Sequence, residues 1–331
     1  MDETAFKQFD IVSYHSDHFY SGVMIKQKRN GDGYSFMYGS RAYKNIMREW
    51  KILKENLPDT IYVRVYETRV ELMRAVIVGA PDTPYQDGLF FFDIWFPPDY
   101  PDYPPEVYYR SHGLSLNPML NSDGGICLSL LNTWFGLRRS ERWDSSRSTI
   151  LQVLVSLQAL VLDETPYYND HERVPAFGSF LERIPFLRKI VILEHKTYNA
   201  RVFVSTCKLT LRLLKNPPKN FELFIGQHYR QRASGILRAI RLRIADGSLK
   251  YCTPMNLLYP QLIDSFRDIG WVEEEELLEL AELKKSPFRW LYICFLVLYG
   301  VAMVIGALYI YIYIRPTRFT SRPTRTLFQL H

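Results

Sequence analysis

Residues 117–134, with the sequence NPMLNSDGGICLSLLNTW, decide the fold and the chemistry of this chain. They place one cysteine, Cys127, directly after Gly124-Gly125-Ile126 and in front of an apolar run. A reactive cysteine needs a thiol open to an incoming group, on a backbone held by packing behind it. The alternative is an ordinary core cysteine, because free cysteines are commonly buried. The rest of the chain has to decide between these two interpretations.

The composition is that of a globular protein with a large aromatic core. Of 331 residues, 47% are hydrophobic and 23% charged, and the chain has 23 tyrosines and 20 phenylalanines. The net charge of +6 comes mainly from a tail: no acidic residue follows Glu282, whereas four arginines follow Ile314. We therefore expect no nucleic-acid-binding face. The start of the chain, Met1-Asp2-Glu3, lacks the apolar segment of a signal peptide, so we expect the main body in the cytosol.

The cysteines favour neither a metal site nor a disulfide framework. Cys127, Cys207, Cys252 and Cys294 share no close spacing and form no Cys-x-x-Cys pair. We therefore expect no metal site. No other cofactor is expected either, on the separate ground of the family resemblance given below.

Two segments precede the strands. Residues 1–40 show no sustained period and are interpreted as a poorly defined leader, either unordered or containing a strand. In residues 41–57 the apolar positions Ile46, Trp50 and Leu53 recur every three or four residues, which predicts an amphipathic helix. Its outer side is basic and includes Arg41, Lys44 and Lys51. This side is either a solvated face or a docking face for an acidic partner.

Strand-like runs follow, separated by turns rich in proline. They cover residues 62–66 continuing into 71–78, then 89–96, then 107–110. The short spacing favours an antiparallel meander. The segment 96–105 contains too many prolines to lie inside a sheet, so it should form a rigid wall beside it.

Helical patterns dominate the chain after Cys127. A polar insert with Trp143 precedes a helix at 149–162, for which Ser148 is the expected cap. Two basic helices are predicted at 199–214 and 221–244, and a polar linker helix at 273–285.

Residues 290–314 are predicted to cross a membrane. These 25 residues carry no charge and would form a helix of about 37 Å, against a hydrocarbon core of about 30 Å. Aromatic residues and flanking basic residues bracket the run, as at membrane interfaces. A buried core helix is the alternative, but core helices of soluble domains are seldom this long and apolar on every side.

The order of these features resembles that of the ubiquitin-conjugating enzymes over roughly residues 41–185. The resemblance rests on GAPDTPYQDGLFF at 79–91, YPDYPP at 100–105 and GGICL at 124–128. Three further motifs are most similar to the large subclass that contains hybrid and plant phosphate-homeostasis enzymes: NTW at 132–134, LQVLVSLQ at 151–158 and PYYN at 166–169. The basic helices around Pro217-Pro218-Lys219 also look like the extension of that subclass.

This resemblance predicts an α+β fold, with a four-stranded antiparallel meander and flanking helices. The expected organisation is a leader at 1–40, a catalytic domain at 41–185, and a helical extension with linker at 186–289. A transmembrane helix at 290–314 and a basic tail at 315–331 complete it.

The resemblance implies that Cys127 accepts ubiquitin as a thioester and passes it to a lysine or to a ligase. In the family a His-Pro-Asn precedes the cysteine; here those positions are Asn117, Pro118 and Met119. Asn117 and Pro118 are expected to shape the site. Met119 departs from the family, because a thioether cannot donate a hydrogen bond. Asn117 or Asn121 is the expected substitute donor.

Further expectations concern the acid near the site and the partners. Asp170 is a candidate for the family acid that orients the attacking lysine, or else an exposed loop acid. Asp102 stands where the family's ligase-contact loop is apolar, and Tyr103 is the neighbouring alternative. The implied partners are ubiquitin, its activating enzyme, which uses the ATP, a ligase and a lipid bilayer.

Three hypotheses follow. The first is a membrane-anchored ubiquitin-conjugating enzyme with its catalytic domain in the cytosol, at the endoplasmic reticulum or the mitochondrial outer membrane. The second is a ubiquitin-binding scaffold in which Met119 has disabled transfer. The third is a membrane adaptor built on the C-terminal helices alone.

Overall fold

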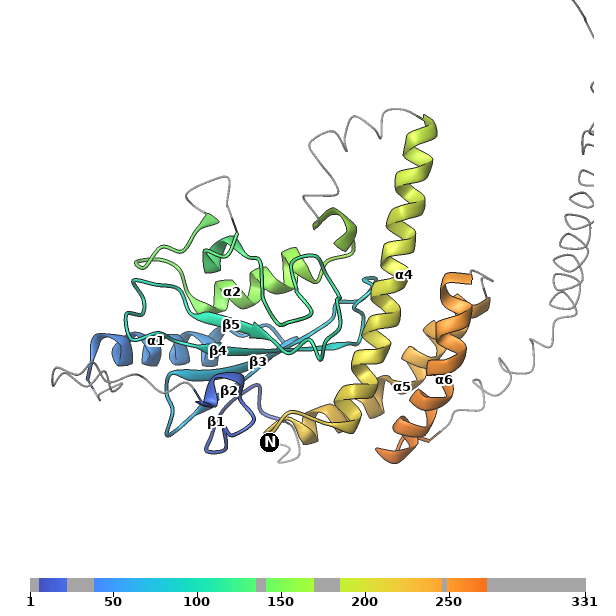
Figure 1. Cartoon of the computed structure of the whole chain (residues 1–331). Helices are drawn as coiled ribbons and strands as arrows, with labels where there is room; N and C mark the ends of the chain where they lie inside the picture. Colours follow the sequence, from blue (N-terminus) through green and yellow to red (C-terminus); the bar gives the residue numbers. More distant parts are fainter. Residues whose placement is uncertain (1–5, 23–38, 135–140, 170–184, 246–248, 273–331) are drawn as a thin grey trace, which may run out of the picture. The chain divides into compact units, whose positions relative to one another are not determined.

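The computed structural model describes residues 6–22, 39–134, 141–169, 185–245 and 249–272, all within one compact unit, Met1–Leu277. At its centre lies a sheet with the strand order β1-β2-β3-β4-β5 (Figure 1). Its strands are β1 (Phe9–Val12), β2 (Ile61–Tyr66), β3 (Leu72–Val78), β4 (Leu89–Trp95) and β5 (Glu106–Tyr109). Strands β2 to β5 form the predicted antiparallel meander, whereas β1 runs parallel to β2. The leader therefore contains a strand, and the sheet is mixed.

One predicted run proves to be two strands. The apolar segments 62–66 and 71–78 were expected to be continuous, but β2 and β3 pair with each other in antiparallel register, with Val63 opposite Ala75. The polar turn between them is closed by a hydrogen bond from Leu72 N to Arg69 O, 2.9 Å long. A polar interruption of a few residues is enough for a hairpin turn.

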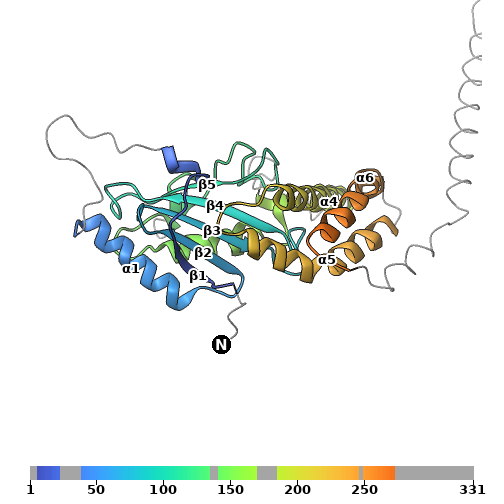
Figure 2. The same cartoon turned by 90° about the horizontal axis from the view of Figure 1, so that it is seen from below.

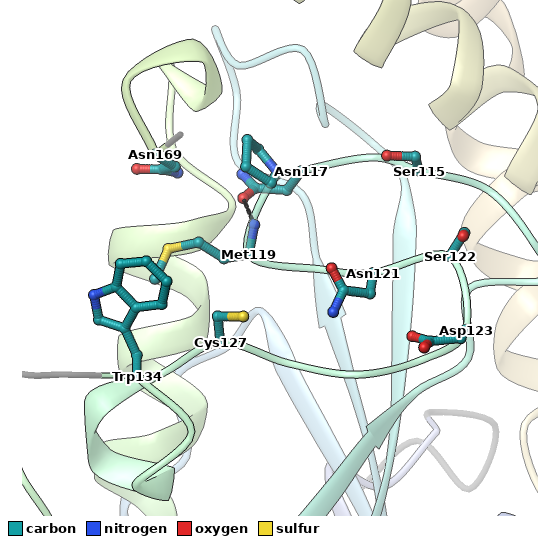
Figure 3. Close-up of a pocket in the computed structure, with 10 residues that line it drawn as sticks. Ser115, Asn117, Met119, Asn121, Ser122, Asp123, Cys127, Trp134 and Asn169 are labelled. Atoms are coloured by element: carbon teal, nitrogen blue, oxygen red, sulfur yellow. Dashed lines mark hydrogen bonds between the residues drawn. The ribbon is translucent and has the colours of Figure 1, made fainter. Parts of the chain in front are cut away.

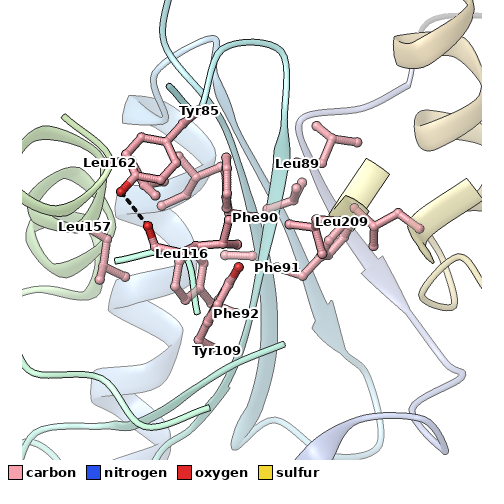
Figure 4. Close-up of a cluster of buried hydrophobic side chains, with 14 of the residues drawn as sticks. Tyr85, Leu89, Phe90, Phe91, Phe92, Tyr109, Leu116, Leu157, Leu162 and Leu209 are labelled. Carbon is pink, nitrogen blue, oxygen red and sulfur yellow. Dashed lines mark hydrogen bonds between the residues drawn. The ribbon is translucent and has the colours of Figure 1, made fainter. Parts of the chain in front are cut away.

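Strand β4 is buried on both faces, which explains its unbroken run of aromatic residues. Because successive side chains alternate, Phe90 and Phe92 face one side and Phe91 the other. The Phe90 ring lies 5.5 Å from that of Tyr85, whereas Phe91 lies 5.2 Å from Phe221 of the extension. Figure 4 shows this cluster, to which Leu157 and Leu162 of the crossover segment and Leu209 of helix α4 (Pro185–Lys215) contribute.

Helix α1 (Arg41–Asn56) forms where the sequence predicts it. Ser40 caps it by accepting a hydrogen bond from Tyr43 N, and Ile46 and Leu53 are fully buried. Glu49, buried among them, accepts hydrogen bonds from Tyr100 Oη at 2.7 Å and from Ile150 N at 3.0 Å. This carboxylate ties the proline-rich wall and the next helix to α1.

The crossover helix occupies the predicted residues, but only its first part is a regular α-helix. Helix α2 (Ile150–Ser156) is capped by Thr149 rather than by Ser148: Thr149 and Gln152 form a reciprocal capping box. Ser148 instead accepts a hydrogen bond from Asp144 N within the insert. The helix widens into a π-helical turn over Leu157–Val161 and leaves one stripe exposed, including Leu160.

Three helices make up the extension: α4 (Pro185–Lys215), α5 (Glu222–Ala245) and α6 (Leu249–Asp268). Helix α4 begins well before the predicted residue 199, and α6 was not predicted. Pro254 and Pro260 lie inside α6 and break its sequence signal. These helices pack on one another at the end of the sheet away from α1 (Figures 1 and 2).

The extension and the sheet share one hydrophobic core. Phe221, Tyr229 and Phe266 are fully buried in the same cluster as the strands. The predicted boundary between 41–185 and 186–289 therefore does not separate two cores.

The leader covers the sheet face that carries Arg74 of β3 and Asp93 of β4. Arg74 Nε lies 2.6 Å from Asp93 Oδ1, and Arg74 Nη1 lies 2.9 Å from Asp17 Oδ2 of the leader. Arg110 Nη1 also contacts Asp93, at 3.0 Å. Burial alone would raise the pKa of Asp93, but the neighbouring Arg74 lowers that pKa to about 2. The leader is thus fixed to the sheet by a buried ion network.

Some predictions lie outside the described residues: the linker helix at 273–285, the transmembrane helix at 290–314 and the tail at 315–331. In the part of the chain that the structure describes, no helix has both the length and the apolarity to cross a bilayer.

Candidate active site

Cys127 lies at the end of a tight turn in which residues 126–127 pair with residues 119–120. Leu120 forms bridges with both Asn117 and Ile126, and Cys127 N donates to Met119 O over 2.9 Å. Gly124 makes the turn possible, because its φ of +97° is strained for other residues and a Cβ there would lie 2.0 Å from Tyr108 Cε2. The turn holds Cys127 next to Met119 in space, although eight positions separate them in the sequence.

The Cys127 thiol is half-buried and opens into a cavity of about 580 Å³. Burial raises the pKa of the Cys127 thiol, and the negative charge of Asp123 raises this pKa further. The residues around the thiol come from three segments: the turn before it, Trp134 after it, and Asn169 beyond the crossover helix (Figure 3). The thiol can therefore be reached from the cavity, and its surroundings disfavour the thiolate form.

Asn117 is buried and fully used within the fold. Its Nδ2 donates to Tyr85 Oη at 2.9 Å and to Val161 O at 2.7 Å, and its Oδ1 accepts from Met119 N at 2.8 Å. An amide nitrogen offers two hydrogens, and both have partners here. Asn117 therefore ties the turn before Cys127 to Tyr85 and Val161, and it has no amide hydrogen left for a substrate oxygen.

The other residues expected at the site lie in different places. Pro118, Met119 and Asn121 line the same cavity as Cys127. Met119 is partly buried and packs against the core, and Asn121 is exposed on the turn. Asp170 lies outside the described residues.

Asn169 was not singled out from the sequence, yet it lines the cavity. It is the last residue of a 3-10 turn, Pro166–Asn169, which the α4 helix supports from behind. The available signal was its motif, PYYN at 166–169, which follows the crossover helix directly. That motif contributed to the family resemblance but was not linked to the cavity.

The loops expected to meet a ligase are joined to each other. Asp102 forms a two-pronged ion pair with Arg41 of α1, at 2.7 and 3.0 Å, while Tyr103 is 63% exposed. Trp143 of the insert donates from Nε1 to Pro101 O at 2.6 Å. Arg41 is therefore partnered within the chain rather than free for an acidic partner.

Comparison with known proteins identifies the class that this fold and cavity define. A family model described as "Ubiquitin-conjugating enzyme" matches residues 45–176, the segment that contains the meander, Cys127 and the crossover helix. The chain belongs to the ubiquitin-conjugating enzyme family.

Its relatives include two Arabidopsis thaliana proteins named as ubiquitin-conjugating enzymes E2 38 and E2 39. The first is 39% identical over 302 residues, which cover 85% of this chain and 85% of the relative. The second is 37% identical over 313 residues, which cover 89% of this chain and 91% of the relative. A third relative, the ubiquitin-conjugating enzyme E2 24 of the same plant, is 39% identical over 285 residues. The match spans 81% of this chain but only 30% of that protein, which is much longer.

Proposed function

We propose that this chain is a membrane-anchored ubiquitin-conjugating enzyme that carries ubiquitin as a thioester on Cys127. The observation that carries the proposal is the position of this thiol, half-buried and facing a cavity of about 580 Å³, in a chain of this family. Cys207 offers a contrast: it is 3% exposed, and burial raises the pKa of its thiol to about 12.

The proposed reaction is two successive acyl transfers. The Cys127 thiolate attacks the carbonyl carbon at ubiquitin's C-terminus, which arrives as a thioester on the activating enzyme; a new C–S bond forms and the enzyme's thiolate leaves. A lysine amine, or a ligase thiolate, then attacks the same carbon and Cys127 departs as thiolate. ATP is consumed by the activating enzyme, so this chain needs no cofactor of its own.

A thioester assay tests this proposal. Incubation with activating enzyme, ATP and ubiquitin should give an adduct that reductant removes. The adduct should be absent in Cys127→Ala and should become resistant to reductant in Cys127→Ser, whereas Cys207→Ala should retain it. An adduct that persists in Cys127→Ala, or no adduct on the wild type, would contradict the proposal.

Met119 supports a second candidate, a ubiquitin-binding scaffold that loads ubiquitin but does not transfer it. The thioether lines the cavity and cannot donate a hydrogen bond to a substrate oxygen. Discharge of the loaded thioester to free lysine separates the two functions. A scaffold should discharge no faster than hydrolysis, and Met119→Asn should then raise the rate by about 10² to 10³, the effect of one oxyanion donor.

The membrane anchor in this proposal rests on residues 290–314, which carry no charge. A tail anchor would keep Cys127 in the cytosol with the activating enzyme and place residues 315–331 on the far side of the membrane. The endoplasmic reticulum is the proposed membrane, and the mitochondrial outer membrane is the alternative. A C-terminal tag in microsomes should resist protease until detergent is added; cleavage without detergent would contradict this orientation.

The partners in the proposal are ubiquitin, the activating enzyme, a ligase and the bilayer. The motifs at 132–134 and 166–169 support membership of the large subclass of hybrid and plant phosphate-homeostasis enzymes.

A further inference from the structure

A polar group at the wall of the Cys127 cavity lacks a partner. The side-chain Nδ2 of Asn169 is buried from solvent and makes no hydrogen bond with any part of the chain that the structure describes. Buried amide donors in folded proteins are nearly always paired, so an unpaired one needs an explanation. Because Asn169 lines the cavity that also holds Cys127, a group bound there can supply the partner.

The chain holds Asn169 in place from behind. Tyr167, two residues earlier, donates from its hydroxyl to Glu194 Oε2 of α4 at 2.7 Å. Asn199 of α4 donates to Glu164 O at 3.0 Å, at the entrance of the same turn. These bonds fix the backbone of the turn to a long helix, while the Asn169 amide itself stays unpaired. A donor set on a fixed support needs little reorganisation when charge develops near it.

Three other donors near the thiol are already occupied. The N–H of Cys127 donates to Met119 O, and that of Leu128 donates to Thr133 Oγ1 at 3.0 Å. Asn117 uses both of its amide hydrogens on Tyr85 and Val161. A substrate oxygen at Cys127 therefore finds none of these donors free.

Met119 lies between the two sides of the cavity. In Figure 3 its thioether is placed between Asn169 and the Cys127 thiol. Methionine is unbranched and flexible, so this side chain can move aside when a substrate enters.

We propose that the side-chain amide of Asn169 is the hydrogen-bond donor to the thioester carbonyl oxygen during transfer from Cys127. This role rests on the function proposed above. As the amine nitrogen attacks, the C–N bond forms and the carbonyl π electrons move to oxygen, which accepts the N–H of Asn169. The pair on oxygen then restores the C=O bond, the C–S bond breaks, Cys127 leaves as thiolate and the amine proton passes to solvent. Asn169 thereby supplies the donor that Met119 cannot.

The test uses the full chain, loaded with ubiquitin and then discharged to free lysine in a single turnover. Asn169→Ala should load at the wild-type rate but discharge about 10²-fold more slowly, the effect expected for loss of one oxyanion donor. Asn169→Asp has nearly the same shape but lacks the N–H when ionised, so it should show a similar loss. Adding Met119→Asn to Asn169→Ala should restore most of the discharge rate.

Controls separate this role from a structural one. The melting temperatures of the Asn169 variants should stay close to that of the wild type, and loading should not change. Asn121→Ala removes the other side-chain amide on the cavity wall and should reduce discharge less than Asn169→Ala does.

Several results would overturn the inference. It fails if Asn169→Ala discharges within about twofold of the wild type, if Asn121→Ala has the larger effect, or if Met119→Asn does not rescue the loss. Absence of any adduct on wild-type Cys127 would instead overturn the proposed function, and this role for Asn169 with it.

Discussion

At Cys127, burial and the carboxylate of Asp123 act on the thiol in the same direction. Both disfavour the thiolate and raise the pKa of Cys127. The thiolate is the attacking species, so the reactive fraction keeps growing as the pH rises past the ordinary thiol range. Attack on an already activated thioester tolerates such a thiol better than chemistry on an unactivated substrate would.

Replacing Asp123 should therefore make Cys127 more reactive. Asp123→Asn removes the negative charge but keeps the oxygen that accepts from Gly125 N at 3.0 Å. We expect alkylation of Cys127 by iodoacetamide at pH 7.5 to become faster, because removal of the negative charge lowers the pKa of the thiol. The measurement is alkylation rate against pH by mass spectrometry. Asp59→Asn, on an exposed residue of another loop, is the control, and an unchanged or raised midpoint in Asp123→Asn would contradict the prediction.

Single residues also show where sequence interpretation stops. The motif around Cys127 predicts an accessible thiol and a site-shaping role for Asn117. The motif does not predict the partners of the two Asn117 amide hydrogens. These partners, Tyr85 and Val161, lie 32 and 44 positions away in the sequence. Hydrogen-bond partners at such separations depend on the packed fold rather than on local pattern.

At the scale of elements, the turn that presents Cys127 depends on one of its two glycines. Gly124 has a left-handed φ, and a Cβ on it would enter the ring of Tyr108. This ring cannot easily move, because Phe19 stacks on it with centroids 3.6 Å apart. Gly125 differs: a Cβ there would meet only Asn121 Nδ2 at 3.1 Å and Asp123 Oδ1 at 3.3 Å, both on exposed side chains.

Gly124→Ala should accordingly destabilise the fold by about 1 to 3 kcal/mol and displace Cys127. Thioester formation should fall with it. Gly125→Ala is the matched control. It should keep most of the fold stability and most of the thioester formation, since the neighbouring side chains can shift by a few tenths of an ångström. Urea denaturation and the loading assay measure the two effects, and equal losses in both variants would contradict the assignment to Gly124.

Elements with a regular period were predicted well, and irregular ones were not. Helix α1 and the meander match their patterns closely. Helix α6 was missed because Pro254 and Pro260 argue against a helix, whereas the burial of Met255, Leu262 and Phe266 on one side stabilises it. Tertiary packing has overridden local propensity in this element.

At the scale of the whole molecule, the extension completes the core. Phe221 is fully buried and contacts Phe91 of the sheet and Phe6 of the leader. Phe221→Ala should cost about 3 to 5 kcal/mol in free energy of unfolding, as for other buried phenylalanines. Leu223→Ala, two residues away and 62% exposed, should change it by no more than about 0.5 kcal/mol. Chemical denaturation checks both; a small effect of Phe221→Ala would mean that the extension is dispensable to the core.

The ion network predicts how stability depends on pH. The folded pKa of Asp93, about 2, lies below the ordinary value near 4, so its ionised form stabilises the fold above pH 4. This contribution is lost as the pH falls from about 4 through 2. Asp93→Asn leaves Arg74 buried and incompletely paired, and should cost about 3 to 5 kcal/mol at pH 6.

The difference between wild type and Asp93→Asn should therefore shrink at low pH. Denaturation at pH 6, 4 and 3 measures it in each protein. A difference that stays constant down to pH 3 would show that Asp93 is not the group responsible. The network itself could not be predicted, since Arg74 and Asp93 stand inside apolar strands and Asp17 lies in a leader without a sustained period.

The shared core has a consequence for how the protein is made. A chain leaves the ribosome from its N-terminus, and domains generally fold as units in that order. Here Phe91 of β4 lacks its contact with Phe221 until that residue of the extension has been synthesised. The meander therefore lacks this part of its core during its own translation, and we expect Phe91 to wait more than a hundred residues of further elongation for its Phe221 partner. Chaperones that recognise unpaired aromatic side chains have their longest access to this protein in that interval.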